Sequence, residues 1–207
     1  MKKTSIAAAA IITLSAFFLC RCNEDNTANN KTQSDSAVTK SNYGGFETEA
    51  LYGKHLVTIA GCNDCHTPKK MTAMGPVPDT SLLLSGHPAA MPLFAVNRKE
   101  MEGKGLAVTN DMTAWVGPWG VSYSANLTPD STGTGTWNKA QFIRAIREGK
   151  WKGLEGSRQL LPPMPWQELG AMSNEELSAI FAYLKSIKPV HNVVPEPMPP
   201  ISANQHH

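Results

Sequence analysis

The sequence predicts an all-α fold, because three helical segments surround a long irregular middle. Residues 48–61, 138–149 and 173–189 each combine apolar residues at helical spacing with residues typical of helix ends. Residues 67–129 lie between the first two segments and have little sustained periodicity. One helical domain with a long insertion is therefore expected.

The first two predicted helices have capping residues at both ends. Thr48 is the candidate N-cap of the first helix and Gly61 its candidate C-cap. The second helix begins at Asn138 and ends at Gly149. Both segments are therefore bounded by residues that favour the start and the end of a helix.

The third predicted helix is the clearest. Ser173 and Glu176 form a capping box at its start, and Pro189 ends it. Its apolar stripe consists of Leu177, Ile180, Phe181, Leu184 and Ile187. Because a stripe of this kind is buried in a folded domain, this helix is expected to pack on another element.

The middle segment is rich in Gly and Pro. Short extended pieces are expected near residues 105–109 and 121–125. Structureless loops beyond about 15 residues are unusual in compact domains unless they are functional. We therefore expect this segment to wrap a large buried object.

The N-terminus, residues 1–22, has the pattern of an export signal. Lys2 and Lys3 precede an apolar run over residues 6–19. The run has 14 residues, whereas a transmembrane helix needs about 20. No later stretch comes closer to that length, so the mature protein is expected to lack a transmembrane helix and to be periplasmic or otherwise extracytoplasmic.

A cysteine follows the apolar run in a pattern that loosely resembles a bacterial lipobox. Leu19 lies three positions before Cys22, the candidate lipidated residue. Lipoboxes prefer Gly or Ala where this chain has Arg21, so Cys20 and a signal that is simply removed both remain open. Any membrane attachment of the mature chain is expected to be by this lipid anchor only.

Residues 23–45 are dominated by Asn, Thr, Ser, Lys and Asp, which is typical of a flexible linker. Without Lys2, Lys3 and Arg21 the chain has 16 basic against 17 acidic residues. A nearly neutral mature chain of this kind gives no indication of nucleic-acid binding.

The main functional motif is Cys62-Asn63-Asp64-Cys65-His66. Two thiols three positions apart can form thioethers with the two vinyl groups of one porphyrin, and the adjacent imidazole can then bind the iron. The motif predicts one covalently bound haem c, with Cys62, Cys65 and His66 as its binding residues.

Two other interpretations of the cysteine pair compete with haem attachment. A structural zinc site needs four ligands, and the mature chain has no further cysteine beyond the candidate lipid anchor. A thioredoxin-like pair or a plain disulfide is chemically possible, but the sequence before Cys62 predicts a helix rather than a strand of a βαβ unit. Haem attachment is the favoured interpretation.

An electron-transfer haem normally has a second axial ligand, for which Met164 is the leading candidate. It lies in the run Leu161–Trp166, where prolines on both sides stiffen the backbone. His87 and His55 are the alternatives. The other methionines after Met1 are expected to fill gaps in the core.

These residues together resemble the class I type mono-haem cytochrome c family, particularly the cytochrome subunits of periplasmic dehydrogenases. The resemblance covers about residues 46–195, with an extended tail at 196–207. Beyond the haem motif it includes residues 126–137, the Pro-Pro-Met-Pro loop and the last helix at 182–186. It implies a cytochrome c-like fold around one haem, with a longer stretch between His66 and Asn126 than in the smallest cytochromes.

The resemblance also implies roles for individual residues. Gly53 and the aromatic pair Phe181 and Tyr183 would mark the crossing of the first and last helices. The carbonyl of Pro76 would accept the free ring proton of the axial histidine and so fix its tautomer. Trp137 is one of several aromatic residues that could border the haem.

The predicted function is single-electron transfer with no catalytic residue in this chain. Its donor would be a partner dehydrogenase, and its acceptor an oxidase or another cytochrome. The alternative is a haem enzyme, such as a peroxidase or a sulfur-compound oxidase, with a displaceable sixth ligand. His87 is the one mild candidate for the distal acid or base that such an enzyme needs.

Overall fold

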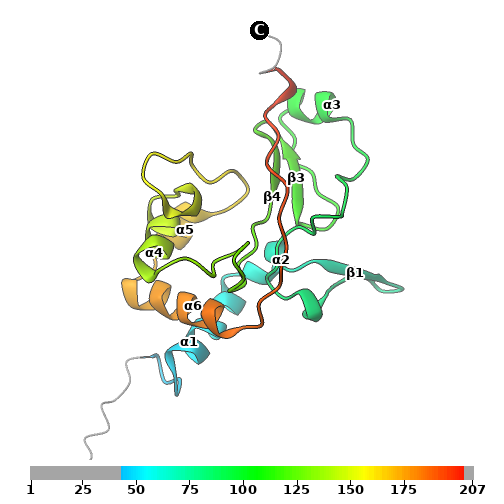
Figure 1. The fold of residues 1–207 in the computed structure, drawn as a ribbon. Helices are drawn as coiled ribbons and strands as arrows, with labels where there is room; N and C mark the ends of the chain where they lie inside the picture. Colours follow the sequence, from blue (N-terminus) through cyan, green and yellow to red (C-terminus); the bar gives the residue numbers. More distant parts are fainter. Residues whose placement is uncertain (1–42, 203–207) are drawn as a thin grey trace, which may run out of the picture. The chain divides into compact units, whose positions relative to one another are not determined.

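A computed structural model of the chain describes residues 43–202 (Figure 1). The predicted export signal, Cys20, Cys22 and most of the predicted linker lie outside these residues. In residues 43–202 no helix has the length and apolar character needed to cross a membrane.

Six α-helices and two short sheets make up the described part (Figure 1). The helices are α1 (Glu49–Ile59), α2 (Cys62–His66), α3 (Arg98–Gly103), α4 (Lys139–Arg147), α5 (Trp166–Leu169) and α6 (Asn174–Ser186). Two 3-10 turns, η1 (Thr80–Leu82) and η2 (Trp151–Gly153), accompany them. The architecture is mixed, so the all-α prediction is corrected to a helical fold with β-structure in its middle segment.

The four strands form two antiparallel hairpins. In the first, β1 (Lys69–Thr72) pairs with β2 (Gly75–Pro78). In the second, β3 (Ala114–Gly117) pairs with β4 (Gly120–Tyr123), and both Val116 and Val121 are fully buried between their neighbours. The piece expected at 121–125 overlaps β4, and the piece at 105–109 contributes only an isolated bridge from Val108 to Val116. The first hairpin was not predicted.

The predicted N-caps are confirmed. Thr48 Oγ1 accepts from the backbone N–H of Leu51 at 3.1 Å, and Asn138 Oδ1 accepts from that of Gln141 at 2.8 Å. At the start of α6, the two hydrogen bonds of the capping box between Ser173 and Glu176 measure 3.1 and 2.7 Å. Short polar side chains therefore satisfy the first free N–H groups of α1, α4 and α6.

Helices α1 and α6 cross in direct backbone contact (Figure 1). A Cβ on Gly53 would lie 1.8 Å from the carbonyl oxygen of Ala179, so only glycine permits this approach. The expected role of Gly53 is confirmed, but the residue opposite it is Ala179. Phe181 instead stacks on Phe142 of α4, with ring centroids 5.2 Å apart.

The C-terminal segment after α6 follows β4 in extended form (Figure 1). Met198 and Val121 exchange two backbone hydrogen bonds of 2.8 and 3.0 Å. Closer to α6, the buried Asn192 side chain donates to the carbonyls of Ser85 and His87 at 2.7 and 2.9 Å. The segment is thus fixed at both ends to the insertion between the first and second predicted helices.

Candidate cofactor site

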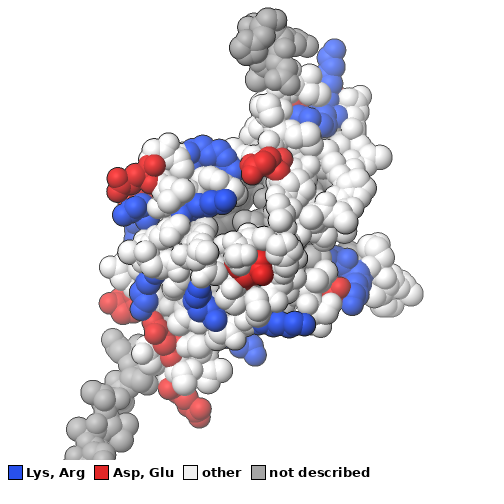
Figure 2. All heavy atoms as spheres, viewed as in Figure 1, with Lys and Arg blue, Asp and Glu red and all other residues white. Residues whose placement is uncertain are grey.

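One large cavity, with a volume of about 630 Å³, opens between the helices and the β3–β4 hairpin. This volume lies within the roughly 300–1,000 Å³ that is usual for small-molecule and cofactor sites. Leu177, Ile180 and Leu184 of α6 form one of its apolar walls, and Phe142 of α4 contributes to another. Figure 2 shows that basic and acidic side chains are interspersed over the face of the molecule on this side.

The haem motif lies at the wall of this cavity. Gly61 lies between α1 and α2 and adopts a left-handed conformation, with φ of 66°. The chain changes direction there, so that α2 begins directly after it. Cys62, Cys65 and His66 on α2 all line the cavity. The two predicted attachment residues and the predicted axial histidine are therefore together at one site.

Both thiols are free and are held in their protonated form by burial. Removal from water raises the pKa of Cys62 to about 11, and it raises the pKa of Cys65 as well. Redox-active pairs of the thioredoxin type need a cysteine whose pKa is lowered, because the thiolate is the reacting species. The environment therefore disfavours that interpretation.

The imidazole of His66 is oriented by a backbone carbonyl. His66 is 8% exposed, and its Nδ1 lies 2.8 Å from the carbonyl oxygen of Ala125. A carbonyl can only accept, so Nδ1 carries the proton and Nε2 keeps its lone pair. Burial also lowers the pKa of His66, which favours the neutral ring. Within residues 43–202, Nε2 has no hydrogen-bond partner and is free to bind a metal.

The prediction for Pro76 is therefore wrong. Pro76 lies exposed on β2, opposite Met71 in the first hairpin. The carbonyl that meets the axial histidine belongs to Ala125, just after β4. The chain does use a backbone carbonyl for this task, but it takes the carbonyl from the second hairpin.

Met164 lines the same cavity as the haem motif. It is half-buried and packs against the core, and it follows a cis peptide bond between Pro162 and Pro163. The hydroxyl of Ser122, on β4, donates to the carbonyl of Pro162 at 2.6 Å. This bond fixes the methionine loop to the strand that precedes Ala125.

Met172 also lines the cavity, from the turn before α6. It is half-buried and packs on the core, as expected for a residue that fills a gap. Two thioethers are thus available at this site, and they differ in how their backbones are held. Met164 lies on a loop with prolines on both sides, whereas Met172 follows Ala171 and precedes the capping box of α6.

The two alternative histidines lie elsewhere. His87 is 1% exposed, and its ring nitrogens lie 2.8 Å from Thr113 Oγ1 and 3.1 Å from the Met91 carbonyl. His55 is exposed on α1 and packs against Phe46. Neither lines the cavity. Of the three candidates for the sixth ligand, only Met164 faces the same space as His66.

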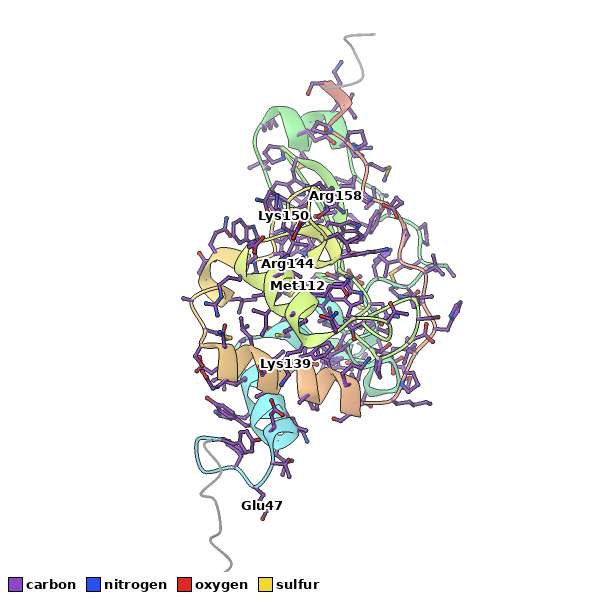
Figure 3. All side chains as sticks on the ribbon, turned by 60° about the vertical axis from the view of Figure 1, so that its left-hand side comes forward. Glu47, Met112, Lys139, Arg144, Lys150 and Arg158 are labelled. Atoms are coloured by element: carbon purple, nitrogen blue, oxygen red, sulfur yellow. The ribbon has the colours of Figure 1, made fainter. Side chains whose placement is uncertain are left out.

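Aromatic and cationic side chains complete the lining. Tyr123 and Trp137 border the cavity, as does Trp151 of η2. The guanidinium of Arg158, labelled in Figure 3, lies 4.2 Å from the ring centroid of Trp151, and Lys152 lies 5.5 Å from it. Among the described residues that line the cavity, Lys152 is the one lysine and Arg158 the one arginine.

The donor set fits a covalently bound haem. Two thiols, an imidazole with a free Nε2 and a thioether face one mainly apolar cavity, and these are the groups that haem c attachment and ligation require. Among residues 43–202, His, Cys, Asp and Glu side chains form no group of three or more able to hold a metal ion. The described residues thus offer no ligand set of the kind that structural zinc requires.

Comparison with known proteins agrees with this fit, although no family model matches the chain. A segment of 87 residues, 41% of this chain, is 40% identical to the cytochrome c subunit of the quinone alcohol dehydrogenase of Gluconacetobacter polyoxogenes. Segments of 79 residues, 38% of the chain, are 39% identical to a subunit of the nicotinate dehydrogenase of Pseudomonas putida and 35% identical to the gluconate 2-dehydrogenase cytochrome c subunit of Pantoea cypripedii.

The matched segments cover 18%, 6% and 16% of these three relatives, so the chain spans less than a fifth of their length. Two of the three are named as cytochrome c subunits of dehydrogenases. The similarity supports a cytochrome c-like domain with an electron-transfer role in this chain. A cytochrome c domain in turn implies haem c.

Two functional groups of the site could not be found by sequence reasoning. The Ala125 carbonyl is a backbone atom and has no signature in the residue type. Ser122 is one of many serines in the chain, and nothing near it in sequence indicates that it bonds to Pro162, 40 residues away. The roles of the Ala125 carbonyl and of Ser122 can be recognised only in the folded structure, where β4 lies beside α2 and the methionine loop.

Proposed function

We propose that this chain is an extracytoplasmic mono-haem c-type cytochrome that carries single electrons. The observation that supports this proposal best is the arrangement of Cys62, Cys65, His66 and Met164 around one cavity. The Nδ1 of His66 is already committed to a carbonyl, which leaves Nε2 for the iron. A bound haem c supplies the one-electron couple.

Each of the four residues has a separate task. The thiols of Cys62 and Cys65 would attach the haem through thioethers, and the imidazole of His66 would bind its iron. Met164 would supply the second ligand to the iron, and a thioether raises the reduction potential relative to a second imidazole. The apolar walls exclude water, which favours rapid electron exchange with little rearrangement of the surroundings.

Lys152 and Arg158 are proposed to face the two propionate carboxylates of the haem. Both side chains line the cavity, whereas Glu196 of the C-terminal segment is its one described acidic lining residue. Burial lowers the pKa of Arg158, and the nearby Glu196 carboxylate opposes this shift. Guanidinium and ammonium groups pair well with carboxylates, so this side of the cavity suits the charged edge of the cofactor.

The donor is proposed to be a partner dehydrogenase, and the acceptor an oxidase or another cytochrome of a respiratory chain. This proposal extends to the chain what the names of two relatives state, namely that they are cytochrome c subunits of dehydrogenases. An exported chain held to the membrane by a lipid on Cys22 would suit exchange over short distances.

Optical spectra of the matured, haem-loaded protein in both oxidation states test the proposal. The weak far-red ferric band of methionine–sulfur ligation is expected, together with no binding of carbon monoxide or peroxide. Met164→Ala should abolish the band, whereas Met172→Ala, which truncates the other thioether of the cavity, should preserve it.

The opposite pattern would contradict the proposal. A high-spin ferric protein that binds small ligands readily would indicate a haem enzyme, such as a peroxidase or a sulfur-compound oxidase. Loss of the band in Met172→Ala alone would assign the sixth ligand to Met172.

A further inference from the structure

Lys69 makes an unusual set of hydrogen bonds at the end of the haem helix. It is the first residue of β1 and follows His66 by three positions. Its ammonium Nζ lies 2.8 Å from the carbonyl oxygen of Asp64, 2.5 Å from that of Thr67 and 3.5 Å from that of Asn63. The side chain therefore turns back over α2 instead of extending into solvent.

These carbonyls include the free ones at the C-terminal end of α2. The last carbonyls of a helix have no partner within the helix and carry partial negative charge, so a cation there is favourable. The Asn63 carbonyl also accepts from the Thr67 N–H at 3.2 Å. Lys69 thus closes the last turn of a helix that contains only five residues, Cys62–His66.

The charge of Lys69 acts close to the proposed axial ligand. Its half-buried ammonium bonds to the carbonyls of Asp64 and Thr67, which lie on either side of His66 in the sequence, so the charge lies at the turn that carries the imidazole. The carboxylates of Asp64 and Asp111 also face it and oppose part of its field. No ion pair within 4.0 Å joins Lys69 to an acidic residue among those described, so its direct bonds go to carbonyls.

We propose that Lys69 is a positioning residue of the electron carrier, which closes the haem helix and raises the reduction potential through its positive charge. This inference rests on the proposed function. Uptake of an electron removes one positive charge from the centre, so a fixed cation beside His66 favours the reduced state. The same ammonium holds the turn that carries the histidine.

Lys70 provides a matched control from the next position. Its ammonium pairs with Asp79 at 2.9 Å, and its side chain is 62% exposed. Water and the Asp79 carboxylate screen this charge far more than that of Lys69. Neutralising each lysine in turn therefore separates the local field at α2 from a general change of net charge.

The experiment is a redox titration of the haem-loaded full chain as wild type, Lys69→Gln, Lys69→Arg and Lys70→Gln. For a half-buried charge we expect Lys69→Gln to shift the equilibrium toward the oxidised form by roughly three- to tenfold. A tenfold shift is about 59 mV for a one-electron couple. Lys69→Arg keeps the charge and should restore most of the potential, and Lys70→Gln should move it by less than about twofold.

The far-red ferric band, recorded for each variant, confirms that the ligands are unchanged. A shift in Lys69→Gln no larger than that in Lys70→Gln would overturn the inference while leaving the proposed function intact. Equal shifts in Lys69→Gln and Lys69→Arg would also overturn it, because the effect would then not follow the charge. A wild-type protein without a reversible one-electron couple would refute the proposed function itself, and this inference with it.

If Lys69→Gln does not retain haem, Asp111→Asn gives a second test that leaves Lys69 in place. Removing a carboxylate that faces the ammonium should raise the potential, because less of the positive field is then opposed. An unchanged or lowered reduction potential in Asp111→Asn would contradict the proposal that the positive charge of Lys69 raises the potential.

Discussion

The crossing of α1 and α6 can be tested by adding a single methyl group at Gly53. In Gly53→Ala the new Cβ would lie 1.8 Å from the carbonyl oxygen of Ala179, 2.4 Å from its carbonyl carbon and 3.0 Å from the N of Ile180. All three atoms belong to the backbone of α6. No side chain can turn aside to make room, so the two helices must move apart.

The expected cost combines two opposing effects. Alanine is better than glycine in a helix interior by about 1 kcal/mol. Against this, inserting a methyl into a well-packed contact costs about 1–3 kcal/mol and more where backbone must shift. Ordinary van der Waals contact begins near 3.4 Å. To remove the clash with Ala179, α1 must therefore move away from α6, and this movement also disturbs the packing of Leu56 and Val57 in the core. We expect net destabilisation of about 1–3 kcal/mol.

Urea unfolding of the haem-loaded protein measures this cost, with Gly103→Ala as the control. Gly103 ends α3, and a Cβ there would meet nothing within 4 Å. The control is therefore expected to be neutral or slightly stabilising, by up to about 1 kcal/mol. Gly53→Ala should also load haem less completely, because α1 leads directly into α2 and Cys62.

A Gly53→Ala protein as stable as the wild type would refute the reasoning. It would mean that α1 and α6 do not approach as closely as the Gly53–Ala179 contact requires. An equal loss of stability in Gly103→Ala would likewise show that the effect is not specific to the crossing.

Two further predictions concern residues around the ligands. Ser122→Ala removes the donor to the Pro162 carbonyl and should destabilise the protein by about 1–3 kcal/mol. Spectra should also show increased carbon monoxide binding. Ser186→Ala is the control, because the exposed Ser186 hydroxyl bonds to the Tyr183 carbonyl within α6, away from the cavity lining. Burial lowers the pKa of His87 below its ordinary 6.5. The unfolded chain therefore takes up a proton first as the pH falls, so stability is full above pH 6.5 and is lost toward the lowered pKa, by at most about 1.4 kcal/mol per pH unit. Thermal unfolding of the haem-loaded protein against pH should be flatter in His87→Gln, and an equal slope would contradict the assignment.

Local signals in the sequence were sufficient for the helices. Caps such as Thr48, Asn138 and Ser173 act within one turn, so their hydrogen bonds follow from neighbours in the chain. The haem motif is local in the same sense, since Cys62, Cys65 and His66 occupy a single short helix. The contact between Gly53 and α6 joins residues that are far apart in the sequence, and it was inferred from the family resemblance.

The contacts that complete the site are long-range and involve backbone atoms. The Ala125 carbonyl lies 59 residues from His66, and the Pro162 carbonyl lies 40 residues from Ser122. Residue types do not encode which carbonyl turns toward a given side chain. The expectation for Pro76 failed for this reason, because the first hairpin carries that proline away from α2 and leaves it exposed.

The second hairpin gives the long insertion a structural purpose. Ser122 lies on β4 and holds the loop of Met164, whereas Ala125, three residues later, orients the ring of His66. One short segment of chain therefore fixes the positions of both proposed axial ligands. The segment is itself held by β3 on one side and by Met198 on the other. The β3–β4 hairpin, which departs from an all-α architecture, thus sets the spacing between the histidine and the methionine. Changes that loosen β4 should therefore weaken the binding of the iron by both proposed ligands together.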